Sequence, residues 1–120
     1  MKKTVIVDDS DEQRLKLKLL LEQHSLPVIE AASGEEGYEK IKNSENLGLF
    51  IFDYNMPGIN GLDLVEKIRN HEEYDGIPIF MLSSENDPQL MARGKKMGAT
   101  WLIKPMNPTG LIKAIKSSVM

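Results

Sequence analysis

Short runs of apolar residues alternate along this chain with segments in which apolar residues recur at helical spacing. Four runs are wholly or mostly apolar, at residues 4–7, 49–52, 79–82 and 100–103, and a weaker one lies at residues 28–29. Because these runs do not alternate between apolar and polar side chains, they predict strands buried on both faces, as in a parallel sheet.

The segments that separate and follow these runs predict helices. They extend from Asp11 to about His24, from the cap residue Ser33 through Ile41, onward from Asn60, from about Asp87 to Met97, and from about Pro108 to Val119. The residues expected to face inward are Leu17, Leu20 and Leu21; Tyr38 and Ile41; Leu62, Val65 and Ile68; Leu90, Met91, Gly94 and Met97; and Ile112, Ile115 and Val119. Apolar residues at this spacing form one face of an amphipathic helix.

Strand and helix alternate five times with short connections, which predicts a single α/β domain over residues 1–120 with a doubly wound parallel sheet. Right-handed crossovers favour the strand order 2-1-3-4-5, with the first and third strands beside the topological switch point. Ligands of such sheets bind beyond the carboxyl ends of the strands. The residues that follow the strands are therefore the candidates for function.

Composition and charge exclude several classes of function. The formal net charge of -3 gives no basic footprint for nucleic acid. The chain has no cysteine, and its two histidines, His24 and His71, cannot build a zinc site by themselves. No apolar run reaches the length of a signal-peptide core or a membrane span. We therefore expect a cytoplasmic protein with neither a membrane nor a nucleic-acid partner.

Polar residues of related chemistry end four of the predicted strands. They are Asp8-Asp9, Asp53, Ser83 and Lys104. Alone, each has an ordinary explanation, since Asp and Ser often cap helices or open turns and Lys is usually solvated. Together they would meet at one edge of the sheet, where three close carboxylates repel one another unless a divalent cation offsets their charge.

The chemistry of this group favours metal-assisted phosphoryl transfer. Oxygen ligands without His or Cys suit Mg²⁺. Asp53 could act as a nucleophile that forms an acyl phosphate, while Lys104 and Ser83 stabilise the phosphoryl oxygens. No G-x-x-x-x-G-K loop is present, so nucleotide hydrolysis is not expected.

These residues, with Asp53-Tyr54-Asn55-Met56-Pro57-Gly58 and Lys104-Pro105, resemble the receiver domain of two-component response regulators over essentially the whole chain. The resemblance implies a flavodoxin-like (βα)5 fold in which Asp53 accepts phosphate from a histidine kinase. It implies Mg²⁺ ligation by Asp9, Asp53 and the backbone carbonyl of Asn55, with Asp8 acting largely through water. Lys104 would contact the phosphoryl group, Ser83 would be the hydroxyl switch, and Lys104-Pro105 would be a cis peptide. No enzymatic activity is expected beyond self-phosphorylation and autodephosphorylation.

The resemblance also suggests an output. Trp101 takes the position of an aromatic residue that turns inward on activation, where Tyr or Phe is more usual, and an ordinary packing role on an edge strand stays open. Asn55 and Glu85, two residues beyond Asp53 and Ser83, match the pair that chemotaxis regulators carry and are expected to influence the phosphate lifetime. This branch implies a monomer whose fourth-helix, fifth-strand and fifth-helix face binds a flagellar motor switch protein or a phosphatase. Candidate contacts are Lys95, Lys96, Lys113 and Lys116, for which plain solvation is the simpler interpretation.

Departures and alternatives accompany this interpretation. Ser10 stands where chemotaxis regulators carry an apolar residue, and Met106 replaces the usual Phe after Pro105. One alternative is a phosphorelay intermediate, or a receiver with another protein-binding output. A more distant one is a small aspartyl phosphatase of the haloacid-dehalogenase type, whose D-x-D motif Asp9-Ser10-Asp11 matches crudely, although Gln13 stands where that motif requires Thr or Val.

Overall fold

A computed structural model describes residues 2–105 and 107–119, with only the backbone of Val119. Met106 and the side chain of Val119, which was expected to face inward, lie outside this description.

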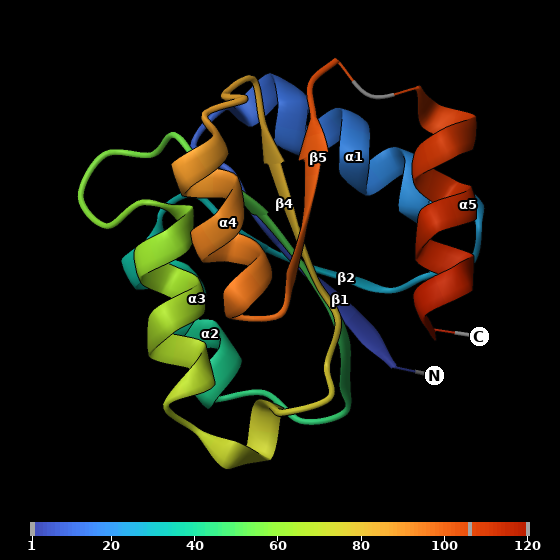
Figure 1. The fold of residues 1–120 in the computed structure, drawn as a ribbon. Coiled ribbons are helices and arrows are strands. Elements are labelled where there is room, and N and C mark those ends of the chain that lie inside the picture. Colours follow the sequence, from blue (N-terminus) through green and yellow to red (C-terminus); the bar gives the residue numbers. More distant parts are fainter. Residues whose placement is uncertain (1, 106, 120) are drawn as a thin grey trace.

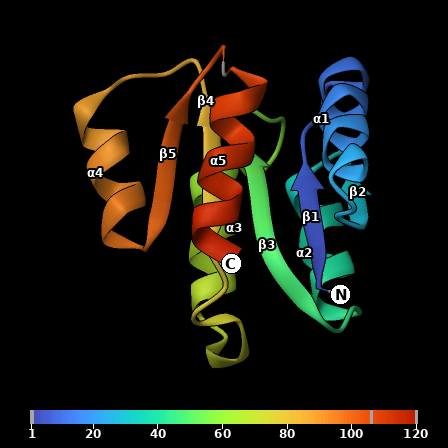
Figure 2. The ribbon, with the colours of Figure 1, turned by 90° about the vertical axis from the view of Figure 1, so that its right-hand side faces the viewer.

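A single parallel sheet forms the centre of the described structure. Its strands are β1 (Lys3–Val7), β2 (Val28–Ala31), β3 (Leu47–Asp53), β4 (Ile79–Ser83) and β5 (Ala99–Ile103). Their order is β2-β1-β3-β4-β5 and every neighbouring pair is parallel, which confirms the predicted topology. Figure 2 shows the strands side by side, with β5 and β2 at the two edges.

Helices cover both faces of the sheet, as the doubly wound arrangement requires. They are α1 (Asp11–Gln23), α2 (Gly34–Lys42), α3 (Gly61–Arg69), α4 (Pro88–Lys96) and α5 (Pro108–Val119). In Figure 1, α1 and α5 lie on one side of the sheet and α2, α3 and α4 on the other. A short 3-10 helix, Glu72–Tyr74, joins α3 to β4 and was not predicted.

Two apolar clusters, one on each face, hold the layers together. Leu17, Leu21 and Ile115 pack from α1 and α5 on one face, and Ile41 and Val65 pack from α2 and α3 on the other. A side chain of this size contributes about 1.5–3 kcal/mol when it is fully buried. The sheet that carries the strand ends is thus anchored from both sides.

Helix α4 differs from the prediction. Of its four residues expected to face inward, Gly94 is buried, whereas Leu90, Met91 and Met97 are only half-buried. The reason is its position: α4 contacts β5, the edge strand, more than any other strand. One side of the helix therefore stays open to solvent.

Short loops connect the strand ends to the helices that follow, and side chains in these loops cap the helices. The Ser10 hydroxyl accepts from the Gln13 N–H at the start of α1, and the Asn60 side chain and Asp63 form a capping box at the start of α3. Such caps satisfy backbone donors that a helix leaves unpaired.

Among the described residues, no helix has the length and apolar character needed to cross a bilayer.

Candidate functional site

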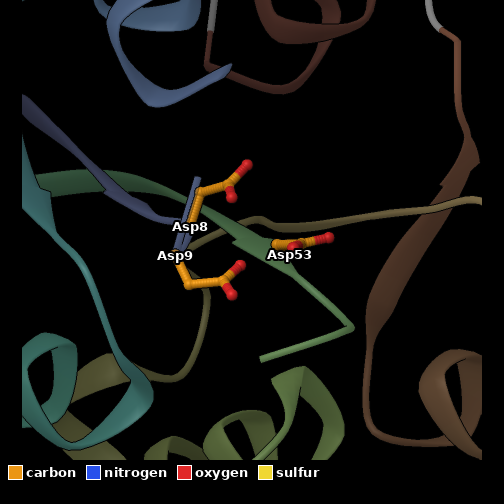
Figure 3. Close-up of side chains that lie close together, drawn as sticks. All are labelled: Asp8, Asp9 and Asp53. Atoms are coloured by element: carbon orange, nitrogen blue, oxygen red, sulfur yellow. The ribbon is translucent and has the colours of Figure 1, made fainter. Parts of the chain in front are cut away.

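Three carboxylates meet beyond the ends of the two central strands. Asp8 and Asp9 follow β1 and Asp53 ends β3, and one oxygen from each lies within 4.8 Å of the others. Figure 3 shows the three side chains side by side at this edge. Asp8 and Asp53 are only 6% and 8% exposed, whereas Asp9 is exposed. The predicted convergence of these acids is confirmed.

Burial and repulsion between neighbouring carboxylates disfavour the ionised forms of Asp8 and Asp53. Burial raises the pKa of the Asp53 carboxyl, and the charges of Asp8 and Asp9 raise it further against the opposing hydrogen bond from Lys104. Burial likewise raises the pKa of Asp8, although the Ser10 N–H and Lys104 act in the opposite direction. The acids would ionise more readily with additional positive charge between them. Oxygen ligands so arranged fit a hard divalent cation.

The Lys104 ammonium group reaches this cluster from the end of β5. Its Nζ lies 3.1 Å from Asp53 Oδ1 and 3.8 Å from Asp8 Oδ2. The Lys104-Pro105 peptide bond is cis, as the resemblance implied. The Lys104 N–H also donates to the Ser83 carbonyl at 2.8 Å, which ties the ends of β4 and β5 together. The predicted convergence of the lysine with Asp53 is therefore confirmed.

Ser83 connects the site to the Trp101 side chain. It is completely buried at the end of β4, and its hydroxyl oxygen accepts from the Glu85 N–H at 2.9 Å. The Glu85 carbonyl in turn accepts from the Trp101 indole N–H at 3.0 Å. The half-buried indole packs on Tyr54, with ring centroids 5.6 Å apart. A continuous set of contacts thus runs from the strand end to the surface of β5.

The loop after Asp53 carries Asn55, whose side chain is exposed. The Gly61 N–H donates to the Tyr54 carbonyl at 3.0 Å and closes this loop. A Cβ atom at Gly61 would lie 2.6 Å from the Asp53 carbonyl oxygen, so only glycine permits the close approach. The loop is therefore held against the strand that bears Asp53.

Two residues of the site were missed by the sequence interpretation. The Gln13 side-chain oxygen accepts from Lys104 Nζ at 2.8 Å. The Arg14 guanidinium donates to the Asp8 carbonyl at 2.7 Å and to Glu30 at 3.3 Å, which fixes the turn after β1. The contacts of Gln13 and Arg14 both depend on how α1 lies over the sheet. The only sequence signal for either residue was that Arg14 lies one helical turn after Ser10.

Residues 4–116 match the family model described as the response regulator receiver domain. The chain belongs to this family. Its function is that of a phosphorylation-dependent signalling switch of two-component systems. The family match favours a signalling receiver domain over a small aspartyl phosphatase of the haloacid-dehalogenase type.

Individual relatives place the receiver domain near the chemotaxis regulators. It is 35% identical over 108 residues to the chemotaxis protein CheY1 of Helicobacter pylori, with 88% of this chain and 87% of that protein covered. The structure of chemotaxis protein CheY4 of Vibrio cholerae superposes with a TM-score of 0.91 at 35% identity, covering 98% of both chains. The receiver domain is also 31% identical to the transcriptional regulatory protein SrrA of Staphylococcus aureus over 114 residues, which are 94% of this chain and 46% of that protein.

Proposed function

We propose that Asp53 is the phosphoacceptor and that a histidine kinase supplies the phosphoryl group. The observation that carries this proposal is the position of Lys104 Nζ, 3.1 Å from Asp53 Oδ1, at the edge of the sheet where the other two acids also lie. Asp8 is less suited as nucleophile, because its Oδ2 lies farther from the ammonium group, 3.8 Å from Lys104 Nζ. Asp53 is the carboxylate on which the lysine and the acidic cluster converge.

In the proposed reaction the phosphoryl group moves from the donor to a side chain of the protein itself, and the protein acts on no other substrate. An Asp53 carboxylate oxygen forms a bond to phosphorus while the P–N bond of the donor phosphohistidine breaks. The histidine nitrogen leaves with the electron pair and takes a proton from water. The Lys104 ammonium donates to the phosphoryl oxygens as charge develops on them. Hydrolysis of the acyl phosphate by water then returns the Asp53 carboxylate and inorganic phosphate.

Asp8, Asp9, Asp53 and the Asn55 backbone carbonyl are the residues that would hold Mg²⁺. The fit rests on three carboxylate oxygens within 4.8 Å of one another and on the raised pKa values of Asp8 and Asp53. A bound Mg²⁺ would supply positive charge between the acids and the phosphoryl oxygens. The exposed Asp9 leaves one side of the cluster open to water, which Mg²⁺ usually retains in part.

For the output, we propose that phosphorylation shifts the population of states of Ser83, Glu85 and Trp101. The Ser83 hydroxyl would turn towards the phosphoryl group. This movement would break the hydrogen bond that it now accepts from the Glu85 N–H at 2.9 Å. The Glu85 carbonyl holds the Trp101 indole, so the surface of β5 with α4 and α5 would change with it. The pair Asn55 and Glu85 would influence how long the phosphate persists.

The proposed partner of this surface is a flagellar motor switch protein, or a phosphatase that acts on the phosphorylated form. The two chemotaxis relatives support this branch of the family. Lys95, Lys96, Lys113 and Lys116 are exposed on α4 and α5 and are available to an acidic partner. We further propose a monomeric protein that acts in the cytoplasm.

Three experiments test these proposals. Incubation with Mg²⁺ and a small phosphodonor, followed by mass spectrometry, should locate one phosphoryl group on Asp53, and Asp53→Asn should remove it. Binding of the phosphorylated protein to a motor-switch peptide would support the chemotaxis output. Back-transfer of phosphate to a histidine phosphotransfer protein, without peptide binding, would favour the phosphorelay alternative.

A further inference from the structure

Gln13 makes the shortest polar contact of the Lys104 ammonium group. Lys104 Nζ lies 2.8 Å from Gln13 Oε1, against 3.1 Å from Asp53 Oδ1 and 3.8 Å from Asp8 Oδ2. An ammonium group can only donate, so it is the carbonyl oxygen of the Gln13 amide that faces it. The contact joins residues 91 positions apart and brings the first turn of α1 into the site.

The backbone of Gln13 is itself fixed to the acidic cluster. Its N–H donates to the Ser10 hydroxyl oxygen at 3.2 Å, and the Ser10 N–H donates to Asp8 Oδ1 at 2.9 Å. A continuous set of hydrogen bonds therefore leads from Asp8 through Ser10 and Gln13 to Lys104, and from Lys104 to Asp53. The backbone from which the exposed Gln13 side chain extends is thus fixed relative to Asp8, and the amide oxygen at its end meets Lys104.

We propose that Gln13 is a positioning residue, which holds the Lys104 ammonium beside Asp53 and thereby sets the rate of phosphoryl transfer. This inference rests on the proposed function of Asp53. A lysine carries its charge on a flexible stem, and the side chain of Lys104 is 24% exposed, so it can turn towards solvent. A second acceptor on its open side limits this motion.

The uncharged amide suits this role better than a carboxylate would. An acid at position 13 would accept the same hydrogen bond but would also neutralise the charge that the phosphoryl oxygens require. It would add a fourth acid to a cluster that already has too little positive charge. The amide orients Lys104 and leaves its full charge available.

The test measures the rate constant for labelling of Asp53 by an acyl phosphate donor with Mg²⁺. In this reaction an Asp53 oxygen bonds to phosphorus, the donor P–O bond breaks, and the donor carboxylate leaves with the electron pair. Gln13→Met, similar in length but lacking the acceptor, should slow labelling about fivefold, which corresponds to about 1 kcal/mol at 1.36 kcal/mol per tenfold. Gln13→Glu should be slower still.

A matched control and a double variant separate positioning from general damage. Gln23→Ala removes an exposed amide from the far end of α1 and should label at the wild-type rate. In a Lys104→Met background, Gln13→Met should cause no further slowing, because the group that it positions is gone. Should that background label too slowly, the same double-mutant cycle on the free energy of unfolding measures the coupling.

Two results would overturn the inference. One is a wild-type labelling rate in Gln13→Met, and the other is the same fold slowing whether or not Lys104 is present. Failure of the proposed function would be recognised differently, because the wild-type protein would then carry no label on Asp53 under any condition.

Discussion

Replacing Lys104 with methionine removes the ammonium group that faces the buried acids and keeps most of the aliphatic stem. Its Nζ lies 3.1 Å from Asp53 Oδ1 and 3.8 Å from Asp8 Oδ2. With an effective dielectric constant of about 20, these distances correspond to about 5 and about 4 kcal/mol of gross Coulomb attraction. The net loss is smaller, because an acid left without its partner can take up a proton.

Proton uptake sets an upper limit on the loss of stability. Protonating one aspartate of ordinary pKa costs about 4 kcal/mol at pH 7 and about 1.5 kcal/mol at pH 5. The pKa values of Asp8 and Asp53 are already raised by burial and would rise further in the variant. An acid with a raised pKa holds more protons in the folded state, so the variant loses stability as the pH rises from the unfolded-state pKa through the folded-state value.

We therefore expect Lys104→Met to lose about 2–4 kcal/mol at pH 7 and less than about 1.5 kcal/mol at pH 5 in the absence of metal. Urea unfolding at the two pH values, with a chelator present, measures the difference. Added Mg²⁺ should restore part of the loss at pH 7. Lys113→Met, at an exposed position of α5, should change the free energy of unfolding by less than about 0.5 kcal/mol. An equal loss at both pH values would refute the electrostatic reasoning and point to lost packing.

Three further predictions concern neighbouring residues. Asp8→Asn keeps an acceptor for the Ser10 N–H and removes a carboxylate whose pKa is raised by burial, so the variant should be more stable than the wild type in thermal unfolding without metal at pH 7. The gain should shrink or reverse in Mg²⁺. Lower stability of Asp8→Asn without metal would contradict this prediction. Beryllium fluoride with Mg²⁺ should change the fluorescence of Trp101, the only tryptophan, and an unchanged spectrum would count against the proposed route to the surface. Gly61→Ala would place a Cβ atom 2.6 Å from the Asp53 carbonyl oxygen and should cost about 1–3 kcal/mol in urea unfolding, whereas wild-type stability would show that the loop can move aside.

The sequence predicted the location of the site because its residues are fixed by strand ends. Apolar runs stop at Asp8, Asp53 and Ser83, and in a parallel sheet the carboxyl ends of neighbouring strands lie at one edge. The pairing of Asp53 with Leu82, the residue before Ser83, shows how directly that rule places the two. No detail of side-chain packing was needed for this part of the prediction.

Features that depend on tertiary packing were not predicted. The bond between Gln13 and Lys104 requires a side chain from the first turn of α1, which packs on β1 and β2, to meet one from the end of the distant strand β5, which no local pattern specifies. The weak apolar pair at 28–29 proved to be part of a longer strand, Val28–Ala31, because pairing with β1 extends it. Likewise, Leu90 and Met91 are less buried than their helical spacing suggested, since α4 packs near the edge of the sheet.

Peptide mapping after incubation with an acyl phosphate donor shows whether Asp53 itself carries the phosphoryl group. With Mg²⁺ present, we predict one phosphoryl group on the peptide that contains Asp53, none in Asp53→Asn, and little labelling after chelation of the metal. A label on Asp9, or an unlabelled protein under all conditions, would show that Asp53 is not the phosphoacceptor.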